Sequence, residues 1–379
     1  MIRLLKKRNF YIINPMKTEK SGYILVLTMM MMGALSAIVV FMFNRGMSVI
    51  PFISTVIARE KAKMVAFGGV QIAQALLSDF TETTSHKKDF HITQDQLADK
   101  NNKAAKEQTV SVEQQFLQKI MPIINRFQTF VLKENIDGVD GTVEVLISCE
   151  DGKINLNKFF DFNSKKFLGE GLKQNDSKII LQTIIKKFEA LTKTAELFPA
   201  LERFLQKQQS PLDDVSQLFE IPEFAPLKDK LFIAKTNDKN LPLTFALTDL
   251  FTVHSWSAAV EPWLLSYTLL HTLGIEDKNT IEQRKKSNNE WLKNFKKTSS
   301  WPATWNTSLK NIYQKEFNSL PKGIDAFFTT NHNPKFFSVL VIATVDKVIQ
   351  KVFAIIERVN RSHNNQIVYD SIIRKFYIL

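Results

Sequence analysis

One uninterrupted apolar stretch near the start of the sequence most constrains what this chain can fold into. Residues 23–43 (YILVLTMMMMGALSAIVVFMF) contain no charged side chain. As a helix rising about 1.5 Å per residue, these 21 residues would span about 30 Å, the thickness of the hydrocarbon core of a bilayer. The sequence therefore predicts a helix that crosses a membrane once.

The charges on either side of this stretch indicate its orientation. Six basic residues and one acid precede it (Arg3, Lys6, Lys7, Arg8, Lys17, Lys20 and Glu19). Because an excess of Lys and Arg normally stays cytoplasmic, we expect the residues after the stretch to lie on the outer side. Basic residues just beyond the stretch oppose this orientation (Arg45, Arg59, Lys61 and Lys63). A cleaved secretory signal and a plain membrane anchor are the alternatives, although the run is longer than a usual signal core.

Composition bounds the rest of the chain. Its 379 residues predict more than one folded unit. The net charge is +12, of which the first 22 residues contribute +5. The densest basic stretch, residues 283–297, is interleaved with Asn and Glu, which favours a solvated helix face over a nucleic-acid groove. Cys149 is the only cysteine, so an intramolecular disulfide is excluded, and its apolar neighbours indicate a core residue.

Periodicity gives a coarse succession of elements. Pro51 and the segment 44–47 predict an interruption of the first helix. An amphipathic helix is then expected over 52–80, with one face formed by Ile53, Ile57, Met64, Gly68, Ile72 and Ala75. The polar residues 81–110 predict a loop or insertion. Further helices are expected at 112–124, 178–191 and 195–205 and from Ser210 onward, and strands at 142–148, 336–345, 352–359 and 366–377.

The sequence lacks the common motifs of catalysis. It contains no phosphate-binding G-x-x-x-x-G-K-[ST], no H-E-x-x-H and no G-x-S-x-G. The six histidines show no paired spacing typical of metal ligands. The sequence therefore predicts a protein that is not an enzyme, with no catalytic residue.

One short motif follows the strand expected at 142–148. Residues 149–157 read CEDGKINLN. Asp151 and Gly152 predict a tight turn, and Asn155 and Asn157 offer side chains that can satisfy nearby backbone groups. With Lys153, these residues are similar to the D-E-x-G-K-I-N-L-N turn of the K-type minor pseudopilins of type II secretion systems (the general secretion pathway protein K family).

Other segments resemble that family in the same order. Gly22 and Tyr23 stand where prepilin peptidase cuts its members, between a basic leader and an apolar helix. Residues 211–222, 247–253 and 259–274 resemble its S-E-L, F-T-V and N-x-N-T-A blocks. The leader is long at 22 residues, and Met16 offers an alternative start of the usual length. The third block reads VEPW where asparagines are usual, and 220–224 lacks the expected glycine. A divergent member and a minor pilin of a type IV pilus both remain open.

The resemblance implies an α+β fold. This is a pilin-like fold with a long N-terminal transmembrane helix, a C-terminal antiparallel sheet and an inserted all-helical domain. The expected divisions are a leader at 1–22, the N-terminal helix at 23–80 with its membrane part at 23–43, the first part of the body at 81–157, the helical domain at 158–240, and the rest of the body at 241–379 with a polar insertion near 275–335.

The resemblance also implies a function. The protein would be a minor pseudopilin at the tip of the periplasmic pseudopilus, acting in protein secretion across the outer membrane. It would cross the bacterial inner membrane once, carry a methylated N-terminus after cleavage and keep its soluble domain in the periplasm. The implied partners are other minor pseudopilins, the major pseudopilin, prepilin peptidase, the inner-membrane secretion platform and the lipid bilayer, with no nucleic acid. An unprocessed, membrane-anchored binding protein of the envelope is the alternative.

Two family features are altered in this sequence. Most pilin-like subunits carry a glutamate at the fifth residue after the cut, and here that place is Leu27, which favours the tip of a filament. Acidic loop residues bind calcium in the family, but the loop here offers only Asn237 and Asp238 between two lysines. No cofactor is therefore predicted from the residues; the resemblance alone leaves calcium open, and no metal ligand is assigned.

Overall fold

The computed structural model describes residues 18–78, 112–170, 177–236, 243–276, 283–284, 286, 300–329, 334–363 and 366–379. They belong to two compact units, Met1–Glu60 and Lys61–Leu379. The leader up to residue 17, the polar stretch 81–110 and the residues Asn237 and Asp238 lie outside the described residues.

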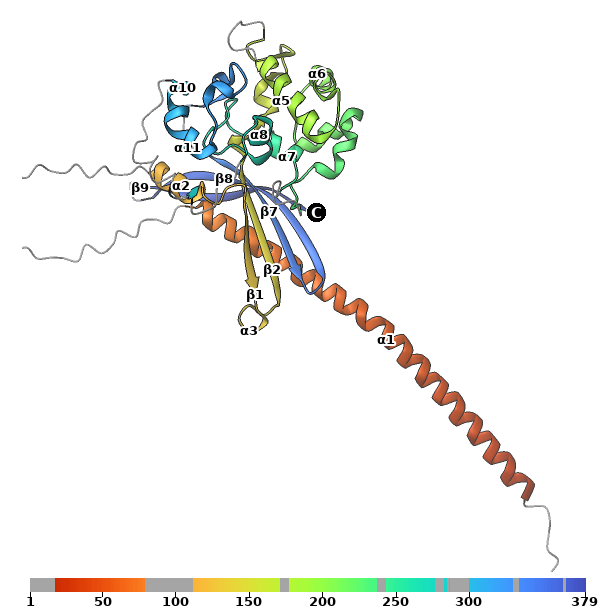
Figure 1. Cartoon of the computed structure of the whole chain (residues 1–379). Coiled ribbons are helices and arrows are strands. Elements are labelled where there is room, and N and C mark those ends of the chain that lie inside the picture. Colours follow the sequence, from red (N-terminus) through yellow and green to blue (C-terminus); the bar gives the residue numbers. More distant parts are fainter. Residues whose placement is uncertain are drawn as a thin grey trace, which may run out of the picture. The chain divides into compact units, whose positions relative to one another are not determined.

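One long helix, α1 (Thr18–Leu77), begins in the first unit and ends in the second (Figure 1). Every residue from 23 to 47 is exposed, and among the described residues this is the one helix that is long and apolar enough to cross a membrane. The helix runs through Pro51 without a break, so the predicted interruption is wrong. A proline removes only one backbone N–H donor, and a long helix can continue past that loss.

In the second unit, the last turns of α1 are buried against strands of a sheet. The buried residues are mostly small: Ala62, Ala66, Gly69, Val70, Ala73 and Leu77. A Cβ atom on Gly69 would lie 2.5 Å from Cγ1 of Val341, so the helix backbone comes close to the strands. The predicted apolar face is wrong, because Met64 is 72% exposed. Small side chains, not large ones, mark the face that lies nearest a neighbouring element.

An antiparallel sheet of five strands forms the second layer of this unit. Its spatial order is β1 (Phe127–Leu132), β2 (Gly141–Cys149), β7 (Phe336–Val345), β8 (Val348–His363) and β9 (Gln366–Ile378). All neighbours pair antiparallel. The three predicted C-terminal strands and the strand at 142–148 are confirmed, because long runs of β-branched and aromatic residues favour buried strands. The α+β fold class is therefore confirmed.

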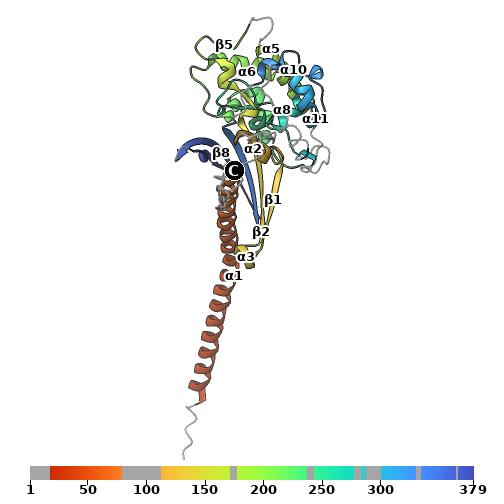
Figure 2. The same cartoon turned by 90° about the vertical axis from the view of Figure 1, so that its left-hand side faces the viewer.

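The segment between β2 and β7 is mostly helical. Figures 1 and 2 show α5, α6, α8, α10 and α11 in one group beyond the end of β2. The longer helices are α5 (Ser177–Thr192) and α6 (Leu197–Lys207), as predicted. The predicted start at Ser210 is displaced, since Asp214 caps the 3-10 helix η3 (Val215–Glu220) in a capping box. The other elements are η4 (Pro222–Lys230), α7 (Leu247–Leu250), α8 (Tyr267–Thr272), α10 (Trp301–Thr304), the π-helix η5 (Trp305–Leu309), α11 (Lys310–Tyr313), η6 (Phe317–Ser319) and η7 (Ile324–Phe327).

Short elements complete the unit. Before and within the first hairpin lie α2 (Val112–Ile120) and α3 (Glu134–Asp137). After β2 come η2 (Glu150–Gly152), β3 (Ile154–Asn155), α4 (Leu156–Phe159), β4 (Phe160–Asp161) and β5 (Lys166–Phe167), and after α7 comes β6 (Phe251–Thr252).

One hydrophobic cluster joins the helical segment to the sheet. It contains Phe188 and Phe198 from the helices together with Phe337 and Val341 from β7. The packing therefore marks no boundary between a helical domain and the sheet, and the domain limits given from the sequence stay predictions.

Candidate functional site

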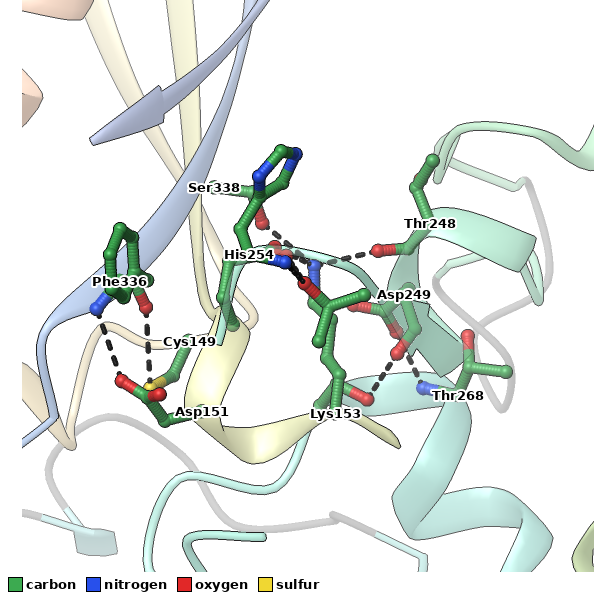
Figure 3. Close-up of polar contacts among 12 residues, drawn as sticks. Cys149, Asp151, Lys153, Thr248, Asp249, His254, Thr268, Phe336 and Ser338 are labelled. Atoms are coloured by element: carbon green, nitrogen blue, oxygen red, sulfur yellow. Dashed lines mark hydrogen bonds and ion pairs between the residues drawn. The ribbon is translucent and has the colours of Figure 1, made fainter. Parts of the chain in front are cut away.

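The sequence motif 149–157 lies where the sheet meets the helical segment (Figure 3). The 3-10 turn η2 directly follows β2, and β3 then pairs in parallel with β6, with Ile154 opposite Phe251 and Asn155 opposite Thr252. Ile154 and Asn155 therefore pair with a segment almost a hundred positions away in the sequence.

Lys153 is at the centre of a buried polar cluster. Its side chain is 1% exposed and forms an ion pair with Glu150, which is 3% exposed. Its Nζ also donates to the carbonyl of Thr248 at 2.7 Å and to Oγ of Ser338 at 2.8 Å. These three acceptors match the three N–H donors of an ammonium group. The second carboxylate oxygen of Glu150 accepts a hydrogen bond from Thr252. A buried charge pair requires this full set of partners.

Asp151 connects the end of β2 to the start of β7. Its Oδ2 accepts hydrogen bonds from the backbone N–H groups of Lys335 at 2.7 Å and Phe336 at 3.0 Å. Its Oδ1 accepts one from the backbone of Trp256 at 3.4 Å. Burial raises the pKa of the Asp151 carboxyl, and these donors oppose the rise. The Asp151 carboxyl thus binds the start of β7 and the segment around Trp256 to the end of β2.

Gly152 is required by close backbone contact. A Cβ atom at this position would lie 1.9 Å from the carbonyl oxygen of Leu264. The carbonyl of Gly152 also accepts a hydrogen bond from the backbone N–H of Ser266 at 3.1 Å. The segment 264–266 therefore lies directly against the turn, where only glycine fits.

The two asparagines of the motif bond to different segments. Asn155 donates from Nδ2 to the carbonyl of Ser255 at 2.6 Å, and its Oδ1 accepts from the backbone of Asn157 at 3.0 Å, which caps α4. Asn157 exchanges two hydrogen bonds with the backbone of Leu212, both at 2.7 Å. Each amide thus bonds to backbone groups that have no partner within a helix or a strand.

The chemistry of this cluster is that of a structural junction. Its charged and amide groups bind one another or the backbone. Burial raises the pKa of the neighbouring Cys149 thiol, which keeps it protonated and a poor nucleophile. Among the described residues, no three His, Cys, Asp or Glu side chains are placed to hold a metal ion.

The other residues singled out in the sequence lie in the first unit. Tyr23 and Leu27 are exposed side chains on α1, and Gly22 belongs to the same helix. Cleavage at Gly22 and the meaning of Leu27 stay predictions.

Next to the junction lies a pocket of about 200 Å³ that sequence reasoning missed. It is lined by Glu150, Asp214, Val215, Ser216, Leu231, Phe232, Thr248, Phe251, His254, Phe353, Ile355, Tyr377 and Leu379. Glu150 is the one lining residue that belongs to the junction motif. The rest come from η3 and its cap Asp214, the segment 231–254, strands β8 and β9, and Leu379, so no local pattern joins them.

Two titratable groups of the pocket have shifted pKa values. Burial alone would raise the pKa of Asp214. Hydrogen bonds from Tyr377 and Ser216 have the opposite and larger effect, so the pKa is lowered overall. Burial lowers the pKa of His254, so its ring is uncharged at neutral pH.

Comparison with solved structures gives a weak likeness. No family model and no curated protein matches the chain. Among solved structures, it is similar to a chain in the crystal structure of the GspK–GspI–GspJ complex of the type 2 secretion system from enterotoxigenic Escherichia coli. The identity is 12%, the TM-score is 0.32, and the match covers 66% of this chain and 82% of that chain. A likeness of this strength supports no inference about what this chain does.

Proposed function

We propose that this protein is a minor pseudopilin of a type II secretion system. In this role α1 anchors the subunit in the inner membrane, and the unit Lys61–Leu379 forms its periplasmic head. The observation that carries the proposal is α1 itself. Residues 23–43 of this helix have no charge and are exposed, whereas its last turns are buried in an antiparallel α+β unit. Such a helix needs lipid or neighbouring apolar helices around its first part.

The length of α1 supports a filament subunit over a plain anchor. About 20 residues are enough to cross a bilayer. Here the helix continues without a break from Tyr23 to Leu77, 55 residues in all, which corresponds to about 80 Å at 1.5 Å per residue. A simple anchor requires no such extension, whereas subunits that stack their helices in a filament do.

The chemistry of the head supports a structural role. In the described residues of the junction, the ion pair and the amides form hydrogen bonds that hold segments of the chain together. The proposed partners are accordingly proteins and lipid: other minor pseudopilins, the major pseudopilin, prepilin peptidase, the secretion platform and the bilayer.

Leu27 supports a position at the tip. A charged side chain in lipid without a partner is costly, up to about 2.5–3.5 kcal/mol at the centre of a membrane helix and less near its ends, where Leu27 lies. In a shaft subunit, a carboxylate at this place would bind the terminal amine of a neighbour. A subunit without such a neighbour is more stable with an apolar side chain, which Leu27 provides.

Site-specific labelling tests the position. Cys149 is the only cysteine and is buried, so a Ser319→Cys variant carries one reactive thiol, on an exposed residue of η6. The label on sheared filaments is expected at one end. A label spaced along the shaft would contradict the proposal. Unmodified protein, treated with the same reagent, is the control for the selectivity of labelling.

A further inference from the structure

The pocket beside the junction has an aromatic wall. Four rings line it, those of Phe232, Phe251, Phe353 and Tyr377. The ring of Phe353 contacts two of the others, with centroid distances of 4.8 Å to Phe232 and 6.0 Å to Tyr377. Tilted rings at these distances form a surface on which a further aromatic ring packs favourably.

One polar group in this pocket has hydrogen-bonding capacity to spare. The backbone N–H of His254 donates to Thr252 at 3.0 Å, but within the described residues no hydrogen bond reaches its imidazole ring. Figure 3 shows this ring turned away from Lys153 and Asp249. As an uncharged ring it offers one N–H donor and one acceptor nitrogen.

The other polar groups of the pocket have partners. The carboxylate of Glu150 binds Lys153 and Thr252, and Asp214 accepts from Tyr377 and from the backbone of Ser216. A guest in the pocket would therefore meet apolar rings on most sides and one neutral hydrogen-bonding group.

The size of the pocket limits the guest. A dry cavity of about 150 Å³ takes a benzene molecule, whereas pockets for drug-sized ligands measure about 300–1,000 Å³. At about 200 Å³, this pocket has room for a single aromatic ring system. Tyr and Trp are the residues that most often fill such pockets at protein interfaces, because they join a large apolar ring to one polar group.

We propose that this pocket receives a Tyr or Trp side chain of a partner protein. The ring packs against Phe353 and its aromatic neighbours, and the hydroxyl or indole N–H forms a hydrogen bond with the His254 ring. The inference goes beyond the proposed function and does not rest on it, since the pocket would serve any protein that presents such a side chain.

The test uses the full chain in an aliphatic detergent and three probes: the N-acetyl amides of tyrosine, tryptophan and phenylalanine. Binding is measured by NMR titration. Because a neutral hydrogen bond adds modestly to affinity, the tyrosine and tryptophan probes should bind roughly threefold to tenfold more tightly than the phenylalanine probe. A His254→Phe variant should bind all three about equally. Equal binding of the three probes by the unmodified chain would overturn the role of His254.

A blocking variant tests the location. Ser216 is an exposed pocket residue in η3, and Ser319 is an exposed residue of η6 outside the pocket. Ser216→Trp should abolish binding, whereas Ser319→Trp should leave it unchanged, with melting curves verifying that both are folded. Binding that persists in folded Ser216→Trp, or no binding of any probe, would overturn the proposal. If free p-cresol binds but the tyrosine probe does not, the pocket takes a small molecule and the partner side chain is ruled out.

Discussion

At the scale of single residues, Gly152 gives the clearest prediction. A Cβ atom there would lie 1.9 Å from a backbone oxygen of Leu264. Backbone cannot move aside as a flexible side chain can, so Gly152→Ala should lower the free energy of unfolding by about 3 kcal/mol. Gly68→Ala is the matched control, because nothing lies within 4 Å of its added Cβ and alanine favours a helix by about 0.5–1 kcal/mol. Urea denaturation should show a lower free energy of unfolding for Gly152→Ala and a higher one for Gly68→Ala. Equal changes in the two variants would contradict the close contact.

The ion pair of the junction makes a second prediction at this scale. Lys153→Met leaves the buried carboxylate of Glu150 without its cation, and breaking a buried pair in this way costs about 3–5 kcal/mol. Adding Glu150→Gln should recover part of that loss, because the unpaired charge is removed. Lys310 and Glu316 form an exposed pair, and Lys310→Met should cost much less than Lys153→Met, because solvent screens the exposed pair. Similar losses from the two lysine substitutions, measured by urea denaturation, would show that the cluster is not a buried junction.

At the scale of elements, the buried face of α1 is open to a direct test. Ala66 is fully buried against the sheet, while Met64, two residues earlier, is exposed. Ala66→Asp places an unpaired charge in the core and should cost several kcal/mol. Met64→Asp should leave the melting temperature of the head nearly unchanged. A lower melting temperature for Met64→Asp than for Ala66→Asp would support the buried face predicted from the sequence instead.

The elements also differ in how well the sequence predicted them. The strands β7 to β9 and the helices α5 and α6 are long and strongly periodic, so their existence and approximate bounds followed from pattern alone. The face of α1 did not, because large apolar residues such as Met64 dominate any periodicity, while the contact depends on Ala66 and Gly69. The pocket was also missed. Asp214, His254 and Phe353 meet there from distant parts of the chain, and nothing local indicates such a meeting.

At the scale of the whole molecule, the central claim is that the chain matures into a filament subunit by losing its leader before Tyr23. The peptidase of the resembling family strongly prefers a residue without a side chain before the bond it cuts, and Gly22 matches that preference. The remaining chain would then begin with the apolar part of α1, which has no charged residue until Arg45.

Mass spectrometry of the N-terminal peptide, on protein purified from membranes of a cell that carries the peptidase, tests this claim most directly. The account predicts a mature chain that begins at Tyr23 with a methylated amine, and a full-length chain when Gly22→Val is introduced. An N-terminus upstream of Tyr23 in the unmodified protein, or equal processing of the two versions, would contradict it.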